Sequence, residues 1–197
     1  MVWIDWFVNY LPLVYLLITA GLVLGLLKSK NFTRPAVVVV IGLELIKAAL
    51  LIFGTYYLWS HNNISKFLLP PHRSVGYFIS YVSYRFILPF AFSLLAALLV
   101  FLAVKFINRS FQERLFYSDE PGFIFYGIIV VGHPLWIFYL FAILAAAAIF
   151  YLVGLIFKKL KFGELFSLRY LWLAIAFLVL FFNQLILRLP LLNSLKF

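Results

Sequence analysis

Long apolar runs constrain this chain more than any other feature of its sequence. An α-helix needs about 20 consecutive apolar residues to cross the hydrocarbon core of a bilayer. Runs long enough for this recur along the chain, with short polar segments between them, at 7–27, 35–59, 87–106, 123–157 and 165–187. They predict membrane-spanning helices, and no stretch indicates a separate soluble domain. We therefore expect one all-α membrane domain over residues 1–197.

The overall composition excludes an ordinary water-soluble fold. Apolar residues make up 66% of the chain and charged residues 11%, whereas soluble domains are about 45–50% apolar and about 25% charged. A soluble fold of this size could not bury so much apolar surface. The chain contains no cysteine, which excludes disulfides, thiolate metal sites and cysteine nucleophiles.

The apolar run at 123–157 is too long for one span and contains a break. Gly132-His133-Pro134 divides it into a helix of about ten residues and a full span over 135–157. Such a short helix reaches about 15 Å, or half of the hydrocarbon core. The prediction is a polytopic helical bundle of about six transmembrane helices with a short fourth helix. An amphipathic helix along the interface is predicted at 75–86, and a kink at Pro89.

The basic residues predict how these helices are oriented. The net charge is +10, from 16 Lys and Arg against 6 Asp and Glu. With the N-terminus outside, ten of these 16 basic residues fall in inside segments and four in outside segments, as the positive-inside rule requires. The inside set is Lys28, Lys30, Arg34, Lys105, Arg109, Arg114, Lys158, Lys159, Lys161 and Arg169. We therefore expect a multi-pass protein of the inner or plasma membrane, with both termini outside.

Four segments follow the motif order of a family of membrane proteases. In chain order they are Arg34-Pro35, Tyr117-Ser118-Asp119, Gly132-His133-Pro134 and Lys161-Phe162-Gly163. This layout resembles the membrane domain of type IV prepilin peptidases, which are bacterial relatives of the presenilin-like GxGD aspartyl proteases. The resemblance implies a six-helix fold in which one catalytic aspartate follows the first span and a second, here Asp119, precedes the short helix.

The chain departs from that family at the positions that carry its chemistry. Lys28 stands in the slot of the first catalytic aspartate, and Tyr117 and Ser118 replace the glycines before Asp119. Aspartyl proteolysis needs two carboxylates that share one proton. The expectation is therefore a proteolytically inactive relative with a binding or assembly role. If the chain were an enzyme, it would be an intramembrane aspartyl peptidase using Asp119.

One acid lies inside a predicted span. Glu44 and Lys47 are three residues apart, which places them on one helix face. Charged groups in a membrane usually face a bundle interior or a water-filled cavity. The pair predicts a structural ion bridge, with three alternatives: the polar site of a small transporter or channel subunit, an acid that faces Asp119, or no site at all in a structural subunit of a membrane complex.

The remaining polar residues point to no further chemistry. Asp119 has a second interpretation as the N-terminal cap of the helix that follows it, and His133 is typical of a turn. Arg85 is expected to extend toward the interface. The three histidines lack metal-ligand spacing, so no metal or cofactor is predicted. The expected partners are the lipid bilayer and other membrane proteins, not nucleic acid.

Overall fold

A computed structural model describes residues 10–21, 33–111, 117, 119–156 and 169–188. These residues form helices and turns, and no strand occurs among them. A helix over Tyr10–Gly21 comes first. The later elements are α2 (Thr33–His61), the 3-10 turn η1 (Ser65–Leu68), α3 (Val75–Val82), the π turn η2 (Ser83–Ile87), α4 (Leu88–Ser110), α5 (Glu120–Val131), α6 (Leu135–Ile156), α7 (Arg169–Phe181) and α8 (Asn183–Ile186). The all-α prediction is confirmed for the described part of the chain.

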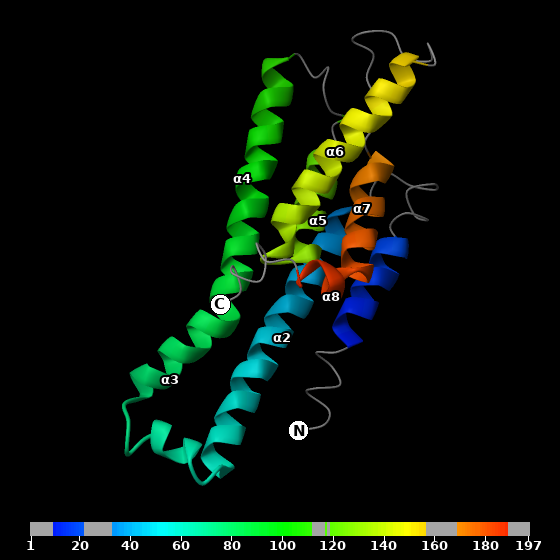
Figure 1. Ribbon diagram of the computed structural model, residues 1–197. Coiled ribbons are helices and arrows are strands. Elements are labelled where there is room, and N and C mark those ends of the chain that lie inside the picture. Colours follow the sequence, from blue (N-terminus) through cyan, green and yellow to red (C-terminus); the bar gives the residue numbers. More distant parts are fainter. Residues whose placement is uncertain (1–9, 22–32, 112–116, 118, 157–168, 189–197) are drawn as a thin grey trace.

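The short helix α5 forms the centre of the bundle (Figure 1). It is 12 residues long, and ten of these residues are buried. Helices α2, α4, α6 and α7 all pack against it. A helix that is apolar on every side fits a protein core or a membrane, and α5 is too short to cross a bilayer by itself, so its place inside the bundle suits it.

The break predicted between α5 and α6 is present. Helix α5 ends at Val131 and α6 begins at Leu135. Gly132 has a φ of 72°, a conformation that glycine adopts without steric cost. Its N–H donates to the carbonyl of Ile128 at 3.0 Å, and its own carbonyl accepts from the N–H of Trp136 at 2.9 Å. The chain reverses here, so that α6 runs back beside α5 (Figure 1).

An irregular helical turn precedes the proline at which a kink is predicted. The π turn η2 joins α3 to α4, and the N–H of Leu88 donates to the carbonyl of Ser83. Pro89 lies in the first turn of α4. A proline ring clashes with the carbonyl four residues earlier, here that of Arg85, so the distortion falls in the preceding turn. Figure 1 shows the resulting bend between α3 and α4.

Two helices are long and apolar enough to cross a membrane. They are Pro35–His61 within α2, and Val75–Ser110, which joins α3, η2 and α4. Only 17% and 11% of their most apolar windows are buried in the protein, whereas the core helix of a soluble protein is mostly buried. Large apolar side chains such as Val38, Phe53 and Leu99 are more than half exposed. Such wide apolar surfaces are typical of contact with lipid or a partner.

The last predicted run, 165–187, is divided in the structure. Helix α7 ends at Phe181 and α8 follows from Asn183. Between them, Phe182 has a φ of −94° and a ψ of 15°, in the sparsely populated bridge region. Residues 165–168 of this run, and both ends of the run at 7–27, lie outside the described residues.

Candidate functional site

The ion pair predicted on one helix face is formed on α2. The ammonium of Lys47 lies 2.8 Å from one carboxylate oxygen of Glu44 and 3.1 Å from the other. The hydroxyl of Tyr15, on the first helix, donates to the same carboxylate at 2.6 Å. The Glu44 side chain is 11% exposed and that of Lys47 is 32% exposed. The pair is therefore partly enclosed and is tied to a second helix.

A cavity of about 320 Å³ lies beside this ion pair. Its polar lining includes Glu44, Lys47, Arg85, Ser93, His133 and Asn183. These six residues come from α2, η2, α4, the α5–α6 break and α8. Apolar walls complete the cavity, among them Leu51, Phe86 and Phe90. We call this cavity the polar pocket.

A buried polar layer lies next to the polar pocket. The hydroxyls of Thr19 and Tyr126 are 2.9 Å apart, and Thr19 also donates to the carbonyl of Tyr15 at 2.7 Å. Thr19 and Tyr126 are both fully buried. Helix α5 lines the pocket only through its last three residues, 129–131. The described part of the pocket is thus confined to one end of α5.

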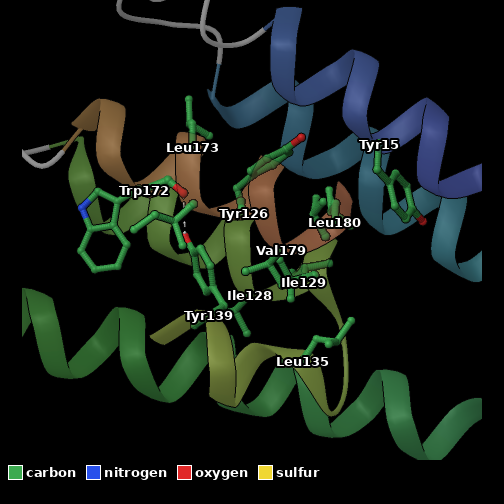
Figure 2. Close-up of a cluster of buried hydrophobic side chains, with 14 of the residues drawn as sticks. Tyr15, Tyr126, Ile128, Ile129, Leu135, Tyr139, Trp172, Leu173, Val179 and Leu180 are labelled. Atoms are coloured by element: carbon green, nitrogen blue, oxygen red, sulfur yellow. Dashed lines mark hydrogen bonds between the residues drawn. The ribbon is translucent and has the colours of Figure 1, made fainter. Parts of the chain in front are cut away.

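Farther into the core, Tyr139 of α6 forms a hydrogen bond with α7. The hydroxyl of Tyr139 donates to the carbonyl of Trp172 at 3.2 Å (Figure 2). Tyr139 is fully buried and its ring lies against Gly127 of α5. The close approach of α5 and α6 depends on the missing side chain at Gly127. The α5–α6 break, which carries His133, joins these two packed helices.

Asp119 lies at the opposite end of α5 from the polar pocket. It occupies the N-cap position of α5, although its side chain makes no capping hydrogen bond. The rise along α5 from Glu120 to Val131 is about 16 Å, at about 1.5 Å per residue. The structure therefore places Asp119 at the end of α5 away from the pocket that Glu44 lines, and it gives no support to the alternative that Glu44 faces Asp119. Lys28, Ser118 and the 161–163 segment lie outside the described residues.

Several residues at the pocket carry no local signal in the sequence. Arg85, His133 and Asn183 belong to three separate elements and meet only through the fold. At the other end of α5, away from the pocket, Glu120 is fully buried, which its place in the sequence does not indicate. The described residues contain no group of three His, Cys, Asp or Glu that could hold a metal ion.

The chemistry that this arrangement supports is polar binding. Cations, a carboxylate, a hydroxyl, an imidazole and an amide converge on one cavity between apolar helices. Comparison with known proteins adds no assignment, because no protein-family model, curated protein or solved structure matches the chain.

Proposed function

We propose that this chain is a multi-pass membrane protein of prepilin-peptidase-like architecture that binds a ligand in the polar pocket and is not an aspartyl protease. The observation that carries this proposal is the Glu44–Lys47 ion pair, which lines a cavity of about 320 Å³ between apolar helices. Charged groups in a membrane are costly and usually mark a functional site. Ligand pockets commonly have volumes of about 300–1,000 Å³.

The proposed topology has six spans and both termini outside. Its support is the ten-to-four distribution of basic residues together with the exposed apolar faces of α2 and α4. In this orientation α2 runs outward and α4 runs inward. The polar pocket contacts the middle of α2, at residues 44–51, and the first half of α4, so it would open toward the outer side of the bilayer.

Transport is the second candidate function. An ion pair that lines a cavity is one of the features that a transporter needs. A path across the membrane would also have to pass the buried layer of Thr19 and Tyr126. The described pocket stops at residues 129–131 of α5. This one-sided shape favours binding over transport.

The absence of aspartyl proteolysis is directly testable. The purified protein, incubated with a prepilin-type substrate, should give no cleavage above background, because aspartyl proteolysis needs two carboxylates that share one proton and Lys28 stands in the slot of the first of them. Asp119→Ala should leave this background unchanged. An authentic prepilin peptidase in the same detergent supplies the positive control. Cleavage that disappears in Asp119→Ala would overturn this part of the proposal.

Thiol labelling tests whether the polar pocket admits water from outside. The chain contains no cysteine, so a single introduced thiol gives a clean signal. Ser93 lines the pocket, whereas Ala97, one turn later on α4, does not. Both positions are at most 1% exposed. A membrane-impermeant thiol reagent added outside should label Ser93→Cys several-fold faster than Ala97→Cys.

Two other outcomes of the labelling experiment have definite meanings. Equal rates at the two positions would show that no water-filled pocket distinguishes them, and the binding proposal would fail. Labelling of Ser93→Cys from both membrane faces would favour transport. Addition of the reagent to inverted vesicles measures accessibility from the second face.

A further inference from the structure

The polar pocket has an excess of positive charge. Lys47 and Arg85 are its cations and Glu44 is its one acid among the described lining residues. Glu44 is already engaged by Lys47 and by the hydroxyl of Tyr15. Arg85 forms no hydrogen bond or ion pair with any described residue. The described lining therefore carries a net charge of +1, counted as two cations minus one anion with His133 neutral.

The described part of the protein offers no acid to balance Arg85. Apart from Glu44, its acids are Asp119 and Glu120. Both lie at the start of α5, about 16 Å from the end that contacts the pocket. At this separation neither acid can pair directly with Arg85. An anion that enters the pocket would be attracted by the positive charge of Arg85.

The local structure around Arg85 suits the recognition of a phosphate group. A guanidinium presents a planar fork of donors that pairs two phosphate oxygens at once. The amide of Asn183 and the ring of His133 line the same cavity and can supply further donors. Arg85 lies on the π turn η2, and π turns frequently occur at functional sites.

We propose that the polar pocket binds a phosphate group, which pairs with Arg85 while Lys47 supplies the second positive charge. This inference rests on the proposed binding function and names the ligand chemistry. The apolar walls formed by Leu51, Phe86 and Phe90 could contact the glycerol and upper acyl chains of a phospholipid whose headgroup phosphate is bound in the pocket. A free phosphate ion is the other source of the same chemistry.

Thermal unfolding of the full chain in neutral detergent separates these sources. A ligand that binds the folded state raises the unfolding temperature, and the increase grows with the logarithm of ligand concentration above the dissociation constant. Phosphatidylglycerol should raise it, and diacylglycerol with the same acyl chains, which lacks the phosphate group, should have a smaller effect. If inorganic phosphate alone reproduces the shift, the ligand is the free ion. The proposal is overturned if phosphatidylglycerol and diacylglycerol give the same shift, or if neither phosphatidylglycerol nor inorganic phosphate gives a shift.

Two substitutions with opposite expected signs test the site itself. Arg85→Gln should weaken the affinity for phosphatidylglycerol by about tenfold or more, because a charge-assisted hydrogen bond is lost. Glu44→Gln should strengthen it, because Lys47 is released from its carboxylate partner. A general effect on folding would lower the affinity in both variants. Titration of the unfolding temperature against lipid concentration gives the two affinities.

Arg73→Gln is the matched control. Arg73 is an exposed arginine that lies over the ring of Tyr77 at 4.7 Å and does not line the pocket. Its replacement should leave the affinity within about twofold of the wild type. Equal losses in the Arg73 and Arg85 variants would overturn the proposal, because they would indicate general attraction of lipid to basic residues. If Ser93→Cys is labelled but Arg85→Gln has no effect, the binding function stands and the phosphate assignment fails.

Discussion

The Gly127→Ala variant is expected to lose about 3 kcal/mol of stability, the upper part of the range for overpacking. A methyl group at this position would overlap the ring of Tyr139. That ring cannot move aside, because it is fully buried and its hydroxyl is bonded to the carbonyl of Trp172. Helices α5 and α6 would have to separate. Thermal or denaturant unfolding in detergent measures the loss.

The chain supplies a control and a second-site test for this prediction. A methyl group at Gly42, in the middle of α2, meets no atom within 4 Å, so Gly42→Ala should unfold at the wild-type temperature or above it. Tyr139→Leu removes the ring atoms that the new methyl group would meet. The combination of Gly127→Ala with Tyr139→Leu should therefore be more stable than the sum of the two single losses predicts. Strict additivity would contradict the proposed contact.

The Lys47→Met variant should be destabilised by about 2–3 kcal/mol, because it leaves the Glu44 carboxylate enclosed without its cation. This loss is smaller than the cost of about 3–5 kcal/mol that is typical when one partner of a fully buried ion pair is removed. Two features of the site reduce it: the Tyr15 hydroxyl still donates to Glu44, and the pocket leaves the pair partly exposed. Denaturant unfolding of the purified variant measures the change.

Neutralising both Glu44 and Lys47 distinguishes the effect of an unpaired charge from the effect of altered side-chain packing. The double variant Glu44→Gln and Lys47→Met keeps side chains of similar length and leaves no unbalanced charge. Its stability should return to within about 1 kcal/mol of the wild type, since replacing a whole ion pair is often neutral. A double variant as unstable as Lys47→Met would show that the methylene chain of Lys47, not its charge, supports the fold.

The positions where the helices of this protein begin and end are largely predictable from its sequence, because residues near each end determine them. Gly132 and Pro134 each disfavour a continuing helix, and the structure ends α5 and starts α6 around them. The start of α5 at Glu120 is earlier than its apolar run suggests. Proline is favoured in the first turn of a helix, and Pro121 occupies that position.

The polar pocket is not predictable in the same way. The Tyr15–Glu44 hydrogen bond joins residues 29 positions apart, and the Thr19–Tyr126 contact joins residues 107 positions apart. Such pairs depend on how the helices pack, which apolar periodicity does not specify. The sequence places Glu44 and Lys47 on one face. It gives no sign that Arg85, on the π turn, lines the same cavity.

In the proposed multi-pass topology, helix α5 also constrains how the chain enters a bilayer. Its 12 residues extend about 18 Å, well short of a hydrocarbon core of about 30 Å. A segment of this length is a poor signal for insertion by itself. The tight turn at Gly132 joins it to the longer, uncharged α6. We therefore expect the two helices to be inserted together as a hairpin. The transfer of α6 into the bilayer would supply the favourable free energy, and α5 would enter because it is joined to α6.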